Sequence, residues 1–304
     1  MPLVSALVPV YNAAPYLGLA LDSLFAQDVE LEVIAVDDAS TDESWRILEE
    51  RAQPRLKALR LETNQGAAAA RNRALEAARG DFLAFLDADD RALPGRLQAQ
   101  LDAFALDADL GILGGGARIV DSQGAPIRHD SPIVSHTRLR WTALFNSGFT
   151  ASTVMVRAQA VRARRHRFRD EWIPAEDYGF FASLLGWTKG ANLARPLADY
   201  RIHPGQVTKR RDEALRRSGN RISQTIIRDW LGMELPLDAV FLLRHLHAFG
   251  RTRLGETGAV SLRPLADGMA SMVMAIFLRF KALPGLEKTE LEAIEAELIE
   301  ALGR

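Results

Sequence analysis

Short apolar runs alternate with amphipathic segments over the first part of the chain. The apolar runs have the length of strands and are rich in branched or aromatic residues, at 5–10, 32–36, 56–61 and 82–86. Apolar residues recur at helical spacing between and after these runs, at 15–27, from 42, at 67–79 and at 94–107. Buried strands that alternate with helices predict an α/β fold whose sheet is mostly parallel and whose crossovers are right-handed.

The alternation ends near residue 110. The apolar run at 110–120 contains glycines, but it lacks the Gly-x-Gly-x-x-Gly spacing of a dinucleotide loop, and a strand and turn rather than a helix follow it. Its glycines are therefore interpreted as a bend in a strand. The pattern is irregular from 121 to 147, and alternation at 149–156 predicts one more strand.

Arginines concentrate between residues 157 and 169. They surround His166 and are Arg157, Arg162, Arg164, Arg165, Arg167 and Arg169. A solvated surface loop is the first interpretation of this segment. The alternative is a landing site for an anionic acceptor.

After Lys209 the composition shifts to a series of helices. Helical spacing predicts them at 212–230, 236–253, 261–280 and 286–302. The last helix carries an apolar stripe among glutamates, formed by Leu291, Ile294, Leu298 and Leu302. Core packing is the first interpretation of such stripes, and contact with a second copy or with a membrane surface is the alternative. The predicted organisation is an α/β domain over 1–208 and a helical region over 209–304.

The composition is that of an ordinary globular protein, with 304 residues of which 48% are hydrophobic and 25% charged. A formal net charge of -1 gives no global attraction for nucleic acid, so no nucleic-acid partner is expected. The absence of cysteine excludes disulfides, thiolate metal sites and a cysteine nucleophile, and it is compatible with the cytoplasm. The first residues lack the features of a signal peptide, and the apolar stretch at 268–278 is far shorter than the roughly 20 residues of a membrane span. A cytoplasmic protein without membrane helices is expected.

Aspartates follow the apolar run at 82–86. Asp87 and Asp89 lie two positions apart in an extended segment, so their side chains point the same way, and Ala88 keeps the approach between them open. Paired carboxylate oxygens suit Mg2+ or Mn2+, which usually complete their shell with water and substrate phosphates. Open α/β sheets bind ligands outside the carboxyl ends of their strands, where these residues fall. The alternative is a solvated acidic turn that caps a strand.

A second pair of carboxylates, Glu176 and Asp177, stands at the start of another predicted helix. The apolar face of that helix is formed by Phe180, Phe181, Leu184 and Leu185. The two carboxylates can interact with the helix dipole, or the turn can hold one of them rigidly over a cleft. Spacing alone does not separate the roles of Glu176 and Asp177.

Several motifs occur in order along the first 208 residues. They are Val-Pro-Val-Tyr-Asn at 8–12, Val-Asp-Asp-Ala-Ser-Thr-Asp at 36–42, Asn-x-Gly-x-x-x-x-Arg-Asn at 64–72, Asp-Ala-Asp at 87–89, Glu-Asp at 176–177 and Tyr-Arg-Ile-His at 200–203. Together they resemble the family 2 glycosyltransferases, which are inverting enzymes of the GT-A fold that use nucleotide-sugar donors. The resemblance implies nucleotide-sugar binding over about 1–120 and acceptor binding, with the catalytic base, over about 121–208.

The resemblance implies a set of donor contacts. They come from Pro9, Tyr11, Asp38, Gly66, Arg71, Asp87, Ala88 and Asp89. Pro9 and Tyr11 would flank the base. Asp38 would accept a hydrogen bond from the base, for which uracil is expected, and Arg71 would lie nearby.

The resemblance also implies the metal site, the catalytic base and the acceptor side. Asp87 would face the ribose and the metal, Asp89 would bind the metal directly, and His203 would approach the metal and the diphosphate. Asp177 is predicted to be the base in preference to Glu176. Glu176 and Trp172 are expected on the acceptor side.

The implied reaction moves a sugar from a nucleoside diphosphate sugar, with a UDP-sugar favoured, to a hydroxyl of a saccharide or lipid-linked acceptor. A bound Mn2+ or Mg2+ would stabilise the departing diphosphate. A carboxylate base opposite the leaving group would invert the anomeric centre. The sequence specifies neither the sugar nor the acceptor.

A single transfer in the synthesis of a cell-surface polysaccharide or glycoconjugate is expected. Processive synthases carry Gln-x-x-Arg-Trp, whereas Gln224, Arg228 and Trp230 have a different spacing. A lipid-linked acceptor would bring the protein to the inner membrane face, with peripheral contact through basic segments. The alternative functions are a metal-dependent nucleotidyltransferase and a non-catalytic relative that binds a nucleotide sugar.

Overall fold

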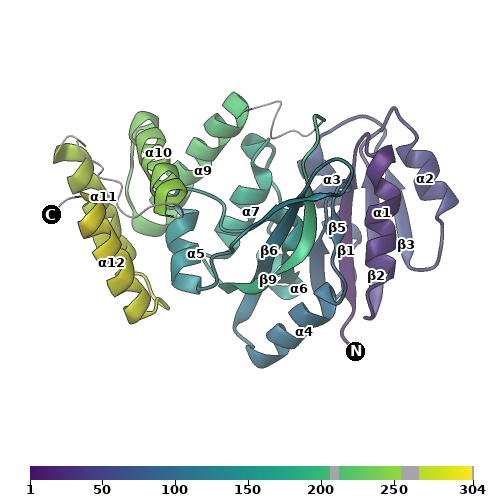
Figure 1. Cartoon of the computed structure of the whole chain (residues 1–304), viewed down its shortest axis with the longest axis horizontal. Helices are drawn as coiled ribbons and strands as arrows, with labels where there is room; N and C mark the ends of the chain where they lie inside the picture. The colour runs from purple at the N-terminus through teal and green to yellow at the C-terminus, as the bar shows by residue number, and fades with distance from the viewer. Residues whose placement is uncertain (206–211, 255–266, 303–304) are drawn as a thin grey trace.

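The computed structural model describes residues 1–205, 212–254 and 267–302, which form a central sheet with helices on both faces and a helical region at one end (Figure 1). The strands are β1 (Val4–Val10), β2 (Leu31–Asp37), β3 (Leu56–Arg60), β4 (Phe82–Phe85), β5 (Arg91–Ala92), β6 (Leu110–Val120), β7 (Pro126–His129), β8 (Met155–Arg157) and β9 (Lys189–Arg201). The helices before residue 206 are α1 (Ala14–Phe25), α2 (Ser44–Glu50), α3 (Ala67–Ala77), α4 (Arg96–Leu106), α5 (His136–Ala143), η1 (Ala151–Thr153), α6 (Ala158–Arg162), η2 (Asp170–Trp172) and α7 (Glu176–Leu184). Later helices are α9 (Asp212–Leu231), α10 (Leu237–Leu254), α11 (Asp267–Phe280) and α12 (Lys288–Leu302).

The sheet joins a parallel half to a mixed half. Its strand order is β3-β2-β1-β4-β8-β6-β9-β5, with β7 beside β6. Strands β1, β2, β3 and β4 pair in parallel, as their alternation with helices predicts. Strand β8 is antiparallel to both β4 and β6, and β9 is parallel to β6. The predicted α/β fold is confirmed, and the mixed pairing is confined to the later strands.

Both faces of the parallel half are buried. In β1, Leu7 joins one hydrophobic cluster with Phe85, whereas its neighbours Ala6 and Val8 join the cluster on the opposite face. Continuous burial explains why these strands are apolar at successive positions. The strands thereby form a rigid base for the loops at their carboxyl ends.

The glycines of β6 form the predicted bend. The pairing of β6 with β9 shifts register between Gly115 and Gly116 and again between Gly116 and Ala117. A Cβ atom at Gly115 would lie 2.6 Å from the side chain of Leu197 and 3.1 Å from the carbonyl oxygen of Arg195. The close approach of β9 therefore requires glycine at this position.

The strand predicted at 149–156 is wrong for most of its length. Residues Ala151–Thr153 form a 3-10 turn, in which Thr150 O accepts hydrogen bonds from the backbone N–H and the hydroxyl of Thr153. Within the predicted strand, only Met155 and Val156, which belong to β8, pair with neighbouring strands. The local hydroxyl bond competes with strand formation here.

The arginine-rich segment is helical in its first part and an exposed turn and loop in the rest. Its first part is α6, and Arg157 donates hydrogen bonds to Leu110 O at 2.8 Å and Phe104 O at 2.7 Å. Arg162 donates to Ala78 O, and Arg167 pairs with Glu76 at 2.6 Å. The surface-loop interpretation is confirmed for residues 163–169, whose arginines are exposed and which form neither helix nor strand, whereas Arg157 and Arg162 brace the fold.

The C-terminal helices extend the core of the α/β part. Helices α9 to α12 lie together beside α5 and α7 (Figure 1), and Trp141 packs edge-on against Phe277 and Phe280 at 5.8 and 5.2 Å between ring centroids. Ile294 of the predicted stripe is buried, and Leu291 and Leu298 pack on the same cluster. The core-packing interpretation is confirmed for these residues. The predicted boundary after 208 and the predicted helix start at 261 lie outside the described residues.

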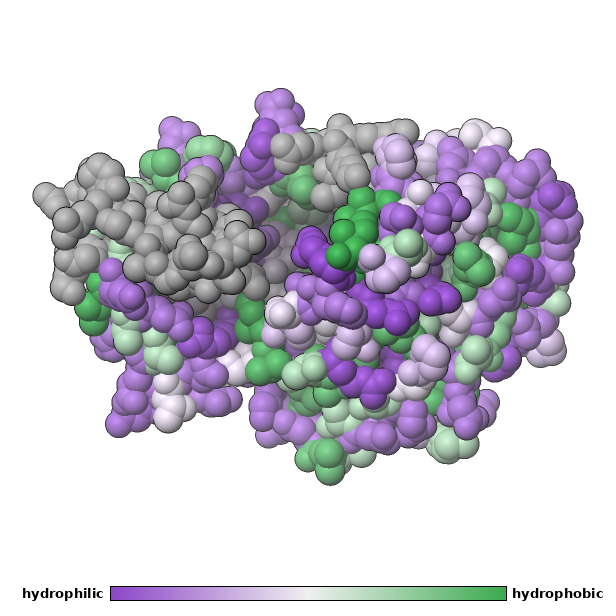
Figure 2. Space-filling view, viewed as in Figure 1, coloured by the Kyte–Doolittle hydropathy of each residue, from purple (hydrophilic) through white to green (hydrophobic). Residues whose placement is uncertain are grey.

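The described surface carries little extended apolar area on the face shown in Figure 2. Residues there are mainly hydrophilic, with apolar residues in small groups. No helix among the described residues combines the length and apolar character needed to span a bilayer.

Candidate active site

The turn after β4 places Asp87, Asp89 and Asp90 at the carboxyl edge of the sheet. Asp90 N donates to Asp87 O at 3.1 Å, which closes the turn. Asp87 N donates to the hydroxyl of Ser152 at 3.0 Å, and Asp89 Oδ2 lies 3.0 Å from His203 Nε2. The turn is thus held from two sides, and it brings the predicted pair Asp89 and His203 together.

Arg71 connects the aspartate turn to the second carboxylate pair. Its Nη2 donates to Asp87 Oδ1 at 2.8 Å, and its Nη1 forms an ion pair with Glu176. Burial alone would lower the pKa of Arg71, but Asp87, Glu176 and Asp177 raise it above its usual value. The guanidinium is therefore a permanent cation that joins β4 to α7.

Asp177 carries a carboxyl group whose pKa is raised. Burial is the largest cause that raises the pKa of Asp177 to about 6, the charge of Glu176 raises it further, and Arg71 partly offsets both. Its Oδ1 accepts a hydrogen bond from Tyr178 N at 2.7 Å, and its Oδ2 has no hydrogen-bond partner within the described residues. Glu176 is 5% exposed and paired with Arg71. The structure thereby distinguishes two residues that spacing alone leaves equivalent.

The predicted base-contact residue Asp38 also organises the loop before α3. Its carboxylate accepts hydrogen bonds from Gln65 N and Gly66 N, both at 2.7 Å, and the side chain is buried. Gly66 has a φ of +91°, which favours glycine in this turn. A hydrogen bond from Asp38 to a nucleotide base stays a prediction.

The loops after β1 and β2 are tied together beside Asp38. Asn12 N donates to Ser40 Oγ at 3.0 Å, and Thr41 N donates to Asn12 Oδ1 at 2.8 Å. Tyr11 is 50% exposed, and Pro9 before it is partly buried. An exposed ring on a fixed loop can stack on a planar base.

A buried network around Asp90 was missed by the sequence analysis. Asp90 is 2% exposed, accepts a hydrogen bond from Ser152 Oγ, and accepts another from Arg201 N at 2.8 Å. Burial, followed by Asp89 and Asp87, raises the pKa of Asp90 well above its ordinary value. Arg201 Nε also donates to Asp89 O at 2.9 Å, so the end of β9 is fixed to the turn. The adjacency of Asp90 to the Asp-Ala-Asp motif was the only signal in the sequence.

Asp89 and His203 fit a divalent cation that shares its shell with phosphate. Within the described residues, no group of three or more His, Asp or Glu side chains converges as a complete metal site. Mg2+ and Mn2+ are commonly held by one or two protein ligands together with substrate phosphates, which agrees with a pair. Burial and the charge of Asp87 raise the pKa of Asp89, and a cation would relieve that repulsion. Asp87 itself is paired with Arg71.

Trp172, which was expected on the acceptor side, is buried in the fold. The indole is 2% exposed and packs so closely on α7 that a Cβ at Gly179 would lie 2.1 Å from the ring. Glu176, predicted on the same side, is buried against Arg71. Both residues are therefore assigned to positioning α7.

Comparison with known proteins identifies the family. Residues 5–167 match the family described as Glycosyl transferase family 2. The chain belongs to this family. A glycosyltransferase of Haemophilus influenzae, described as uncharacterized, is 34% identical over 212 residues, which cover 68% of this chain and 82% of the relative. The succinoglycan biosynthesis protein ExoO of Rhizobium meliloti is 27% identical and covers 96% of this chain and 82% of its own length.

Solved structures of other proteins share the fold of this family 2 glycosyltransferase. S. aureus TarS 1-349 in complex with UDP-GlcNAc has a TM-score of 0.62 at 25% identity, covering 99% of this chain and 89% of TarS 1-349. The mannosyltransferase PcManGT from Pyrobaculum calidifontis, in complex with GDP-Man and Mn2+, has a TM-score of 0.56 at 19% identity. The match covers 99% of this chain and 86% of the mannosyltransferase chain. The second likeness concerns the fold alone. Together they confirm the predicted GT-A architecture.

Replacing Arg71 with methionine is expected to lower the free energy of unfolding by about 3–5 kcal/mol, because buried Glu176 and part-buried Asp87 lose their cation. Urea denaturation measures the change. Arg73→Met, on the same helix, is the matched control: Arg73 is exposed and its contact with Glu76 is long, at 3.5 Å. The control should stay within about 0.5 kcal/mol of the wild type. Equal stabilities of the two variants would contradict the bridging role.

Proposed function

We propose that this glycosyltransferase is a metal-dependent, inverting enzyme that transfers a sugar from a UDP-sugar to a hydroxyl. The observation that carries the proposal is one connected network at the carboxyl edge of the sheet. It runs from Asp87, which shares a turn with Asp89, through Arg71 to Glu176 and the neighbouring Asp177. The network joins a candidate cation site to a candidate base.

The donor assignment rests on the aspartate turn and on the neighbours. TarS is described in complex with UDP and with UDP-GlcNAc, which supports a uridine diphosphate sugar as donor. Asp89 and His203 would hold a cation, and that cation would supply Lewis-acid stabilisation of the departing diphosphate. Tyr11 would stack on the base, and Asp38 would hold the loop beside it.

Asp177 is proposed to take the proton of the attacking hydroxyl. Its uncommitted Oδ2 and its raised pKa suit a base that works near neutral pH. A hydroxyl activated on the side opposite the diphosphate displaces it in line, so an α-linked donor gives a β-linked product. Glu176 and Arg71 fix the first turn of α7, and hence the position of Asp177.

The acceptor is proposed to be a saccharide or a lipid-linked saccharide in cell-surface polysaccharide synthesis. This proposal is supported by the similarity of the chain to ExoO, a succinoglycan biosynthesis protein. We place this non-processive reaction in the cytoplasm, with peripheral membrane contact where the acceptor is lipid-linked.

Ligand-dependent thermal stability tests the donor assignment. UDP with Mn2+ should raise the melting temperature above that given by Mn2+ alone, since a ligand at 100 times its Kd stabilises the native state by about 2.7 kcal/mol. GDP with Mn2+ should give a smaller shift. Release of UDP from UDP-GlcNAc, followed by chromatography, then tests catalysis. A shift no larger with UDP than with GDP would contradict the uridine assignment.

The rate of transfer should depend on pH through Asp177. Its pKa of about 6 means that the carboxyl is protonated, and unable to accept a proton, below that pH. We expect kcat/KM to fall about tenfold per pH unit below pH 6 and to level off above it. A rate profile from pH 4.5 to 8 measures this limb. A rate that stays constant from pH 8 down to pH 4.5 would show that no base with a pKa near 6 limits the reaction, and would contradict this role of Asp177.

A further inference from the structure

A small cavity lies outside the network above. It has a volume of about 210 Å³ and is lined by Gly115 and by two loop segments, 130–132 and 147–150. A water molecule occupies about 30 Å³ in the liquid, so the cavity can take a group of several non-hydrogen atoms.

The register of the sheet places this cavity at the same edge as Asp87. Met155 of β8 pairs with Ala84 of β4 and with Leu113 of β6. Since β8 is antiparallel to both, β4 and β6 run in the same direction with Ala84 and Leu113 level. Gly115, two residues beyond Leu113, is therefore level with the residue before Asp87.

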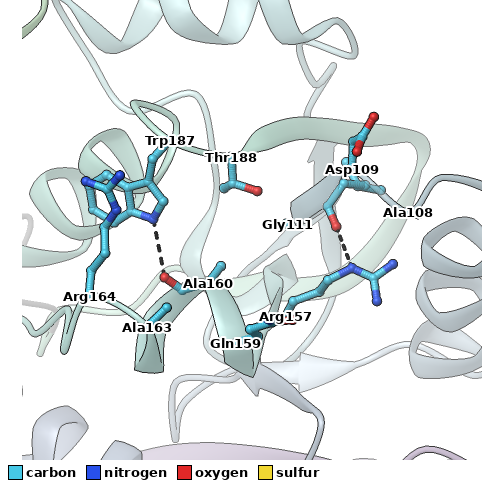
Figure 3. Close-up of a pocket in the computed structure, with 11 residues that line it drawn as sticks. Ala108, Asp109, Gly111, Arg157, Gln159, Ala160, Ala163, Arg164, Trp187 and Thr188 are labelled. Atoms are coloured by element: carbon cyan, nitrogen blue, oxygen red, sulfur yellow. Dashed lines mark hydrogen bonds between the residues drawn. The ribbon is translucent and has the colours of Figure 1, made fainter.

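A second cavity, shown in Figure 3, lies at the opposite edge. It has a volume of about 220 Å³, and its lining includes Leu110 and Gly111 at the start of β6 and Arg157 at the end of β8. By the same register, this cavity is level with Phe82 at the amino end of β4. It is remote from the carboxylates and serves as the reference surface for the test below.

The walls of the 210 Å³ cavity continue into the proposed catalytic elements. Phe149 packs on Phe181 of α7, with ring centroids 6.0 Å apart, and the first turn of that helix carries Asp177. Two residues after Thr150, Ser152 holds the Asp87 amide and Asp90. The cavity is thus joined to both the donor turn and the base.

Hydrogen bonds from Asn192 hold the walls of the cavity in place. Asn192 is 5% exposed, and its Nδ2 donates to Ile133 O at 2.7 Å and to Gly148 O at 3.0 Å. These two bonds link the segment after 132 to the segment at 147–150. A site whose walls are already fixed loses little entropy on binding.

Its polar groups suit a neutral, hydroxyl-rich ligand. Asp130 is exposed, and its carboxylate has no hydrogen-bond or ion-pair partner within the described residues. The hydroxyls of Ser131 and Thr150 likewise have no partner there, whereas the hydroxyl of Ser147 bonds Phe149 O at 2.8 Å. A carboxylate accepts hydrogen bonds from sugar hydroxyls and repels phosphate or uronate groups.

We propose that this cavity, which we call the 130/150 pocket, binds a neutral sugar unit of the acceptor. Asp130 would accept hydrogen bonds from two hydroxyls of that unit, and Thr150 would orient it toward Asp177. The inference rests on the proposed function, because it gives the acceptor of that reaction a binding site. It also predicts that the sugar unit next to the transferred residue is uncharged.

Saturation-transfer NMR with simple glycosides tests the proposal. The probes are the methyl glycosides of glucose, galactose and N-acetylglucosamine, with methyl glucuronoside as the anionic counterpart, each in the presence of UDP and Mn2+. At least one neutral glycoside should receive saturation, and methyl glucuronoside should receive none. Asp130→Ala and Thr150→Val should each weaken the binding of that neutral glycoside about tenfold or more, as expected for loss of hydrogen bonds to the ligand.

Asp109→Ala is the matched control, because Asp109 is an exposed aspartate that lines the opposite cavity. It should bind the neutral glycoside as the wild type does. The proposal is overturned if no neutral glycoside binds at millimolar concentration, if methyl glucuronoside binds as well, or if both pocket variants bind like the control. The UDP-dependent rise in melting temperature is measured on the same samples. If UDP does not raise the melting temperature of the wild type, that result would instead count against the proposed function.

Discussion

Replacing Asp177 with asparagine is expected to lower kcat by about 10²–10⁴-fold while the UDP-dependent rise in melting temperature is kept. Asparagine keeps the oxygen that accepts from Tyr178 N at 2.7 Å, so the first turn of α7 is preserved. It cannot accept the proton of an attacking hydroxyl. The measurement is the initial rate of UDP release with a saccharide acceptor.

Stability distinguishes this loss of rate from misfolding. The pKa of Asp177 is raised from 3.8 to about 6, so its contribution to stability is complete below pH 3.8 and is lost as the pH rises through 6. Asp177→Asn should therefore be more stable than the wild type at pH 7. Asp170→Asn, at an exposed position seven residues earlier, is the matched control and should keep full activity. An Asp177→Asn enzyme with more than half of the wild-type rate would remove Asp177 from the mechanism.

Replacing Asp89 with asparagine is expected to lower kcat by about 10²–10³-fold and to abolish the part of UDP binding that depends on Mn2+. The variant removes the charge that would bind the cation and leaves His203 as the remaining half of the pair. Calorimetric titration of UDP, with Mn2+ and with a chelator, measures the metal-dependent part.

The same change should stabilise the protein when no metal is present. Burial and the charge of Asp87 raise the pKa of Asp89, so the ionised form is disfavoured in the folded protein, and removing its charge relieves that repulsion. Urea denaturation in chelator should show a higher free energy of unfolding for Asp89→Asn than for the wild type. Asp28→Asn, at an exposed position, controls for the loss of one carboxylate. Unchanged dependence of UDP binding on Mn2+ would refute the assignment of Asp89.

The parallel half of the fold and its donor edge could be predicted from sequence because their signals are local. A short apolar run between charged residues predicts a buried strand, and the residues that follow it must then lie at the carboxyl edge. Asp87 and Asp89 are placed in this way. The apolar stripes of the last helices have the same local origin, and Ile294 is buried as expected.

The rest of the site depends on contacts between residues far apart in the chain. Ser152 meets Asp90 across 62 positions, and Arg201 meets it across 111. Nothing near Ser152 in the sequence indicates this contact, and the turn at Ala151–Thr153 replaces the first part of the predicted strand, so that β8 begins only at Met155. Trp172 and Glu176 are likewise expected on the acceptor side from the sequence, whereas packing against Gly179 and the ion pair with Arg71 bury them.

The position of a bound cation tests the central claim most directly. Crystals grown with UDP and MnCl2 and measured at the manganese absorption edge locate Mn2+ by anomalous scattering. We predict one strong peak between the diphosphate and the protein, at coordination distance from the Asp89 carboxylate and His203. Bound UDP with manganese elsewhere, or with Asp89 and His203 turned away from both, would contradict the proposed donor site.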